Sequence, residues 1–165
     1  MITIVSATAN DYQTIRDIAH QTWPIAYGEI LPKVQLDYML GAFYNDEALK
    51  DSVVNIGHRF VLAKEGELTL GFASYEHHYN QKPQTKIHKI YILPEIQGKG
   101  IGKTVIDFIE NLAKENHSTT LTLNVNRSNK ALHFYQKLGF QIVGEVDIEL
   151  DHGYLMEDYV MEKPF

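Results

Sequence analysis

A glycine-rich segment, LPEIQGKGIGK at residues 93–103, is the part of the sequence best suited to bind an anion. Gly98, Gly100 and Gly102 stand at alternate positions directly before an apolar, helix-like run. A loop of small residues that leads into a helix leaves backbone N–H groups unpaired at the positive end of the helix dipole, where phosphate binds well. A simple chain reversal needs only one or two glycines, so the segment favours a phosphate site over a turn.

Two common nucleotide motifs do not fit this spacing. The dinucleotide pattern G-x-G-x-x-G, started at Gly98, requires a glycine where Lys103 stands. The sequence GKT at 102–104 matches the end of a P-loop, but Gln97 occupies the place of its first glycine. The apolar run at 120–126 also ends without an acid that could hold magnesium. The sequence therefore argues against nucleotide hydrolysis.

The charge distribution supports a polyanionic ligand at this segment. Residues 82–103 carry five lysines against one acid, a local charge of +4 within a chain whose net charge is −6. A solvated charged face is the alternative explanation for these lysines. The acidic remainder of the chain argues against general affinity for nucleic-acid backbone, which depends on lysine and arginine. The five lysines are Lys82, Lys86, Lys89, Lys99 and Lys103.

Length and composition predict one globular domain over residues 1–165 with a sizeable apolar core. The absence of cysteine excludes disulfides, thiolate metal sites and a cysteine-acyl intermediate. The beginning of the chain does not resemble a signal peptide, and no window approaches 18 consecutive apolar residues. We therefore expect a soluble, cytoplasmic protein with no membrane partner.

The periodicity of apolar residues predicts an α/β sandwich with a mixed, mainly antiparallel sheet. Parallel neighbours are expected only around the helix that starts at Gly100, and Pro24, Gly28 and Pro32 are expected to interrupt the chain after the first helix. The predicted helices lie after residue 10 and at 33–44, 46–56, 100–116 and 129–139. The predicted strands lie at 2–7, 85–93, 119–126, 140–150 and 154–163, with two more within 59–79 joined by a turn at Glu65, Gly66 and Glu67.

Two segments together resemble the GNAT superfamily of N-acetyltransferases. The segment QGKGIG at 97–102 is similar to the acetyl-CoA pyrophosphate loop of that superfamily, whose pattern is Q/R-x-x-G-x-G/A. The segment NRSNKALHFYQKLGF at 126–140 resembles its second signature, N-x-x-A-x-x-x-Y-x-x-x-G-F. The resemblance covers about residues 58–163 and implies a sheet of about seven strands, flanked by helices, whose central strands splay apart.

The resemblance implies acetyl-CoA as acyl donor and no metal. It assigns the main chain of the strand that precedes the loop to the pantetheine arm, with a bulge that opens the sheet there. Asn129 would also contact the cofactor, although it stands six residues before Tyr135 where the pattern has seven, so Asn126 and Ser128 are alternatives. The implied cofactor-binding residues are Ile90, Tyr91, Ile92, Gln97, Gly98, Lys99, Gly100, Ile101, Gly102, Lys103 and Asn129.

Two residues are the predicted catalytic groups. The resemblance implies that Tyr135 donates a proton or hydrogen bond to the departing thiolate, a task that suits a phenol at neutral pH. The places where family members carry a glutamate base hold His88 and Asn124, and only His88 can accept a proton. Alternation places His88 on the same face as Ile90 and Ile92, so a structural histidine remains an alternative.

Other residues could also accept the proton. Glu76, Tyr75 and a chain of water molecules are further candidates for the base. Adjacent strand residues point to opposite faces, so His77 and His78 do not form a metal site.

The sequence predicts an N-acetyltransferase that moves an acetyl group from acetyl-CoA to a primary amine by direct attack in a ternary complex. The alternatives are a non-catalytic acyl-CoA sensor and a protein N-terminal or lysine acetyltransferase. HQTWPIAYGEI at 20–30 resembles polyamine acetyltransferases, and the acids between Gly144 and Lys163 favour a cationic small-molecule acceptor, although solubility alone also explains them. A homodimer is left open.

Overall fold

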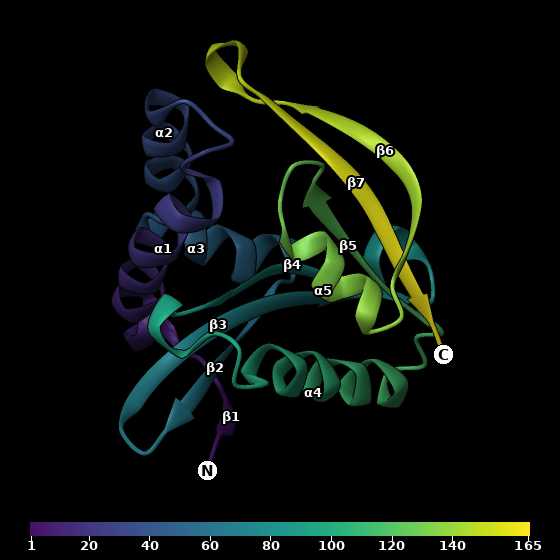
Figure 1. Cartoon of the computed structure of the whole chain (residues 1–165). Coiled ribbons are helices and arrows are strands. Elements are labelled where there is room, and N and C mark those ends of the chain that lie inside the picture. The colour runs from purple at the N-terminus through teal and green to yellow at the C-terminus, as the bar shows by residue number, and fades with distance from the viewer.

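The computed structural model covers all 165 residues, and its elements follow the predicted order (Figure 1). The helices are α1 (Tyr12–Tyr27), α2 (Lys33–Phe43), α3 (Asp46–Asp51), α4 (Ile101–Glu115) and α5 (Ala131–Lys137). The strands are β1 (Thr3–Ser6), β2 (Arg59–Glu65), β3 (Leu68–His77), β4 (Gln84–Ile92), β5 (Thr120–Asn126), β6 (Gln141–Glu149) and β7 (Leu155–Pro164). None of the helices combines the length and apolar character that crossing a bilayer requires.

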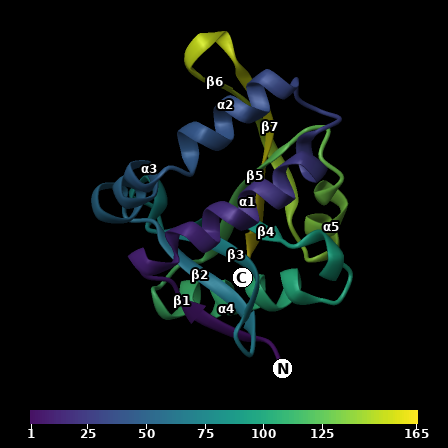
Figure 2. The same cartoon turned by 90° about the vertical axis from the view of Figure 1, so that its left-hand side faces the viewer.

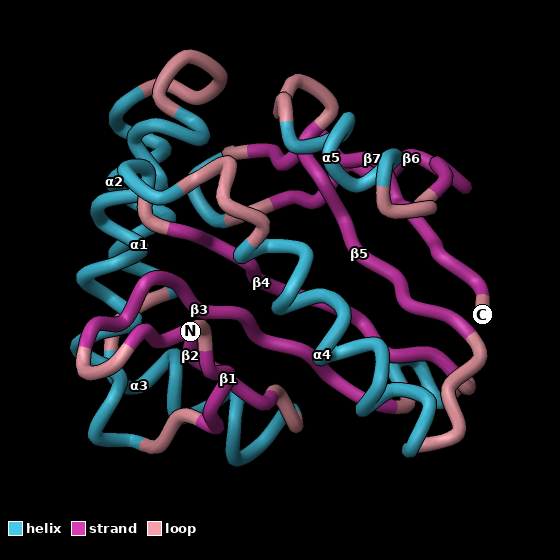
Figure 3. Tube along the Cα trace, turned by 60° about the horizontal axis from the view of Figure 1, so that its bottom comes forward, coloured by secondary structure: helices cyan, strands magenta, loops and turns pink.

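The strands form one seven-stranded sheet in the order β1-β2-β3-β4-β5-β7-β6 (Figures 1 and 3). Every neighbouring pair is antiparallel except β4 and β5, which run parallel because α4 carries the chain back between them. The predicted turn between β2 and β3 is present, and Gly66 takes a positive φ of 61° there. The mixed, mainly antiparallel α/β sandwich is therefore confirmed.

Helices cover both faces of the sheet. The face under α4 and α5 contains a core of α4 residues at helical spacing, such as Ile101, Val105 and Ile109, which pack on Leu121 and Leu123 of β5. The opposite face holds a second core under α1, α2 and α3, and Figure 2 shows α1 and α2 lying across the sheet. Residues of one strand therefore belong to two environments according to the direction in which they point.

The sequence predicts an interruption at Pro24, but helix α1 does not end there. It continues to Tyr27, and Gly28 then donates its N–H to the carbonyl oxygen of Pro24 at 2.9 Å. Trp23 and Tyr27, on either side of Pro24 in the chain, are both buried in the core under α1, α2 and α3. Packing of these two aromatic side chains outweighs the loss of one helical N–H donor.

Gly71 provides a prediction about the contact between β3 and β4. A Cβ added there would lie 2.6 Å from Cδ1 of Ile92 and 2.7 Å from the carbonyl oxygen of Tyr91. Because the second of these atoms is backbone, Gly71→Ala must push β4 away, and we expect a loss of about 2 to 4 kcal/mol in the free energy of unfolding. Urea unfolding of the two proteins measures this difference.

Gly41 in α2 offers the matched control. It is exposed, and no atom lies within 4 Å of the position where its Cβ would stand. Gly41→Ala should therefore stabilise the protein by about 0.5 to 1 kcal/mol through helix propensity. Equal stability of Gly71→Ala and the wild type would show that the two strands tolerate a wider spacing.

Candidate functional site

Strands β4 and β5 pair over only half of their length. The parallel ladder runs from Gln84 opposite Thr120 to Ile87 opposite Leu123 and stops there. Beyond this point β4 remains paired to β3 on its other side, up to Ile92 opposite Gly71. The edge of β4 from residue 88 to 92 therefore offers N–H and C=O groups toward the gap, as the predicted splaying of the central strands requires.

A β-bulge at His88 marks the place where the strands separate. Ser74 of β3 pairs with Lys89 and Tyr75 pairs with Ile87, so His88 is an extra residue on β4. A bulge increases the local twist and bends its strand, which here turns β4 away from β5. The bulge expected from the family resemblance is thus present.

The bulge corrects one expectation about His88. Ile90 and Ile92 pack against the core under α4, whereas His88 stacks on His58 and bonds Glu76 on the α1 side of the sheet. His88 and Ile90 therefore point to opposite faces, because the extra residue breaks the alternation on which the prediction relied.

A cavity of about 660 Å³ occupies the gap and reaches from α4 and α5 on one side to α1 on the other. It is lined by both predicted catalytic residues, Tyr135 and His88. Lys99 and Lys103 do not line it, since Lys99 is exposed and the ammonium group of Lys103 pairs with Asp107 at 2.6 Å. The predicted cofactor residues that line the cavity are Ile90, Tyr91, Ile92, Gln97, Gly98, Gly100, Ile101, Gly102 and Asn129.

The glycine-rich loop has the geometry of an anion site. Gly98 and Gly100 have positive φ angles of 85° and 77°, and no atom lies within 4 Å of where their Cβ atoms would stand. Gly100 is the N-cap of α4 and no side chain caps this helix, so the first N–H groups of α4 have no intrahelical partner. The backbone thus leaves open space beside several free donors, which fits a pyrophosphate group.

Gly102 lines the cavity and also lies at the contact between two helices. Its Cβ would lie 3.0 Å from Cζ of Phe134 in α5, so its small size allows α4 and α5 to approach. The five lysines of residues 82–103 do not all lie near the loop. Lys86 and Lys89 project into the α1 side, near His58 and His88, and not toward the loop.

Tyr135 is buried beside the cavity, and burial raises its pKa far above the usual range of tyrosine. The phenol therefore keeps its proton at neutral pH and is available as a donor. Asn129 accepts a hydrogen bond from the N–H of Ala131 at 2.9 Å and lines the cavity. Asn126 is buried and accepts a hydrogen bond from the N–H of Ser128 at 2.9 Å. Of the three residues considered for this cofactor contact, Ser128 and Asn129 line the cavity and Asn126 does not.

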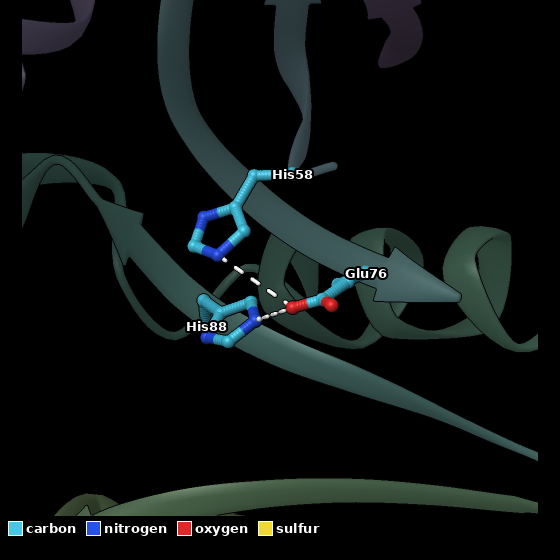
Figure 4. A group of neighbouring side chains, drawn as sticks. All are labelled: His58, Glu76 and His88. Atoms are coloured by element: carbon cyan, nitrogen blue, oxygen red, sulfur yellow. Dashed lines mark hydrogen bonds and ion pairs between the residues drawn. The ribbon is translucent and has the colours of Figure 1, made fainter. Parts of the chain in front are cut away.

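His58, Glu76 and His88 form a compact cluster on the α1 side (Figure 4). Nε2 of His88 lies 2.9 Å from Oε1 of Glu76, and the ring of His58 stacks on that of His88 with 3.8 Å between centroids. Nε2 of His58 lies 3.7 Å from the same carboxylate oxygen. One carboxylate thus faces two imidazoles.

Burial decides the charge of this cluster. It lowers the pKa of His58 to about 4 and lowers the pKa of His88, with the neighbouring charges of Lys86 and Lys89 acting in the same direction. Burial raises the pKa of Glu76, which the charge of Lys86 opposes. Both rings are therefore neutral at pH 7, which is the state in which His88 can accept a proton.

The ring orientation favours a hydrogen-bonded cluster over a metal centre. The rings of His58 and His88 are within 15° of parallel, so their nitrogen lone pairs do not converge on a point between them. His77 and His78 are separate from this cluster, and His77 bonds the hydroxyl of Thr85 at 2.8 Å.

Sequence reasoning missed two residues of the site. His58 lies at the start of β2, thirty residues from His88, and no motif connects them. Tyr27 lines the cavity from α1, and its hydroxyl lies 3.0 Å from that of Tyr91. The sequence of residues 20–30 resembles polyamine acetyltransferases, but that likeness does not identify Tyr27 as a residue of the site.

The acids of the closing hairpin, which were expected to favour a cationic acceptor, do not line the cavity. Pairing places Glu145 beside Tyr159 and Asp147 beside Glu157, on the face that carries α5 and away from α1. Arg127 pairs with Asp147 at 2.8 Å on the same face. Of the seven acids between Gly144 and Lys163, none lines the cavity and only Asp158 is buried.

The known proteins that this chain resembles are acetyltransferases. Residues 12–140 match the model of the acetyltransferase (GNAT) family. A spermidine N(1)-acetyltransferase of Thermoplasma acidophilum is 25% identical over 169 residues, which cover 99% of this chain and 98% of that protein. A 5-NmdU N-acetyltransferase of Pseudomonas phage PaMx11 is 31% identical over 146 residues, which cover 88% of this chain and 91% of that protein.

Solved structures share the fold. The PaiA N-acetyltransferase of Thermoplasma acidophilum, solved in complex with coenzyme A, has a TM-score of 0.82 and 24% identity, with 100% of this chain and 99% of that chain covered. A GCN5-related N-acetyltransferase structure from Rhodopseudomonas palustris has a TM-score of 0.83 at 19% identity, with 99% and 95% covered. The seven-stranded sheet with one parallel pair is therefore the fold of these proteins.

The buried His58 predicts a pH-dependent stability. Its pKa is about 4 in the folded protein and near 6.5 in an unfolded chain, so the unfolded state binds more protons as the pH falls below 6.5. Stability should therefore fall between pH 6.5 and 4 by on the order of 1 to 3 kcal/mol more in the wild type than in His58→Gln. Urea unfolding across this range measures both slopes.

The exposed His20 of α1 supplies the matched control, since His20→Gln removes a histidine outside the core. This variant should follow the pH profile of the wild type. Parallel profiles for the wild type and His58→Gln would contradict the prediction.

Proposed function

Because the chain belongs to the acetyltransferase (GNAT) family, we propose that it transfers an acetyl group from acetyl-CoA to a primary amine by direct attack in a ternary complex. The observation that carries this proposal is the single cavity that joins the glycine-rich loop, the free edge of β4, Tyr135 and His88. An anion site, an unpaired strand edge, a buried proton donor and a neutral base are the parts that acyl transfer from a long phosphorylated thioester requires.

The main chain holds the donor in this proposal. The N–H groups around Gly98 and Gly100 and at the start of α4 bind the pyrophosphate, and the free edge of β4 at Ile90, Tyr91 and Ile92 pairs with the amides of the pantetheine arm. Gln97 supports this edge, since its side chain donates to the carbonyl oxygen of Ile92 at 3.0 Å. Asn129 lines the opposite wall.

Two side chains move protons. An ionised Glu76 accepts the Nε2 proton of His88, which leaves the Nδ1 lone pair of His88 free to take a proton from the acceptor nitrogen. The nitrogen forms its bond to the acetyl carbon as the bond from that carbon to sulfur breaks. Tyr135 gives its proton to the departing thiolate, so the products are an amide and free coenzyme A thiol.

A cationic amine is the acceptor that the available observations favour. One full-length relative is a spermidine N(1)-acetyltransferase, and the segment at 20–30 that resembles polyamine acetyltransferases contributes Thr22, Tyr27 and Glu29 to the cavity wall. Glu29 and Asp158 place negative charge at or beside this side of the cavity. We propose a small amine with more than one positive charge as the acceptor.

The glycine loop supplies a test of donor binding. Gly100→Val fills space that is open in the folded protein and strains a residue with φ of 77°, so it should weaken coenzyme A binding by about tenfold or more. Isothermal calorimetry with coenzyme A measures the affinity.

Gly66→Val is the matched control. Gly66 also has a positive φ and open space, but it lies in the turn between β2 and β3 and outside the cavity. This variant should be strained to a similar degree and bind coenzyme A as the wild type does. Equal coenzyme A affinities of the Gly100 and Gly66 variants would show that the loop only reverses the chain and does not bind the pyrophosphate.

Thiol release tests the catalytic proposal. The wild type should release free thiol from acetyl-CoA when spermidine is added, and Tyr135→Phe should lower kcat by about 10² while changing the KM for acetyl-CoA less than about threefold. The hydroxyl acts only as the thiolate leaves, which is why kcat carries the effect. Wild-type turnover in the Phe variant would make Tyr135 a packing residue, and coenzyme A binding without thiol release from any amine would indicate a sensor.

A further inference from the structure

Asp158 of β7 is a buried carboxylate without a charged partner. The residue is 5% exposed, and its Oδ1 atom makes no hydrogen bond. The two cations whose charge reaches it are engaged elsewhere, Lys86 with the hydroxyl of Tyr79 at 3.1 Å and the side chain of Arg127 with Asp147 at 2.8 Å. An ionised carboxylate that is removed from water without a counter-ion is costly, so the folded protein gains when a cation binds beside it.

Asp158 lies at the α1 side of the cavity. It pairs with Asn126 on β5 and Val146 on β6, and its face of β7 is that of Met156, which packs into the core under α1 and α2. The charge of Asp158 acts on Tyr27, and Asn124 lies beside the carboxylate. Tyr27 and Asn124 both line the cavity, so Asp158 stands directly behind its wall.

The register of the sheet separates Asp158 from His88. Continuing the β4–β5 register would bring His88 opposite Asn124, which pairs with Val160, and Asp158 lies two residues from Val160 on the same strand. Two strand spacings and two residues correspond to a distance of roughly 12 Å between the backbone positions, and the separation of β4 from β5 after Ile87 makes the distance longer still. A single ammonium group cannot reach both side chains, whereas a chain of several methylenes with an amine at each end can.

We infer that Asp158 binds a second ammonium group of the acceptor, distant from the amine that reacts, so that the enzyme selects diamines and polyamines over monoamines. This inference rests on the proposed function, because it takes His88 as the place where the reacting amine loses its proton. Asp158 then provides the only buried negative charge that the closing hairpin brings to the α1 side of the sheet. Glu162 points to the same face but is only half-buried and lies four residues further along β7, and the remaining hairpin acids are exposed.

Substrate selectivity is the first test. The ratio of kcat/KM for spermidine to kcat/KM for n-butylamine should exceed about ten in the wild type and fall by at least about tenfold in Asp158→Asn. Both values come from one protein sample, so partial unfolding of the variant cancels in the ratio. Glu157→Gln removes the same charge from the neighbouring, exposed position and should keep the wild-type ratio.

Binding without turnover is the second test. Calorimetric titration of spermidine into the protein saturated with coenzyme A should show at least about tenfold weaker binding in Asp158→Asn, while the affinity for coenzyme A itself stays the same. This result together with no thiol release would overturn the proposed function and support the role of Asp158. An unchanged selectivity ratio, equal spermidine binding by both proteins, or no spermidine binding by the wild type would overturn the inference.

Discussion

The β-bulge at His88 is the constraint on which the rest of the site depends. With one extra residue on β4, the strand stays bonded to β3 but turns away from β5 after Ile87. The same extra residue reverses the direction of His88 relative to Ile90, so a side chain that alternation assigns to the α4 core instead meets Glu76. One local irregularity therefore both opens the gap and places the proposed base at its α1 side.

Burial then fixes the protonation states that acyl transfer needs. Loss of contact with water disfavours the charged form of each group, so it lowers the pKa of His88 and raises the pKa of Tyr135. At neutral pH one ring nitrogen of His88 is therefore free to accept a proton and Tyr135 keeps its proton, and the charges of Lys86 and Lys89 act on His88 in the same direction as burial. The same effect lowers the pKa of Lys89 to about 8.

The fold and the backbone geometry of the glycine loop could be predicted from the sequence, because both depend on the main chain. The periodicity of apolar residues identified the order of the elements, and glycines report directly on backbone that must take positive φ, as Gly98 and Gly100 do. The sequence predicts an interruption at Pro24, but α1 continues through it because burial of Trp23 and Tyr27 outweighs the local effect of proline. His58 and the face of the hairpin acids depend on register and on contacts between distant segments, which no local pattern encodes.

The two sides of the cavity also differ in how they can change. The proposed donor site consists of backbone groups of β4 and of the loop before α4, which persist through most substitutions as long as the bulge and the glycines remain. The α1 side of the cavity is lined by side chains from α1 and β5, with Asp158 of β7 behind them, and strand alternation allows only every second hairpin residue to point to that side. A single change at Asp158 would therefore alter the charge offered to the acceptor while the donor site stays intact. Selectivity for the amine can thus vary within this fold independently of the chemistry of acetyl transfer.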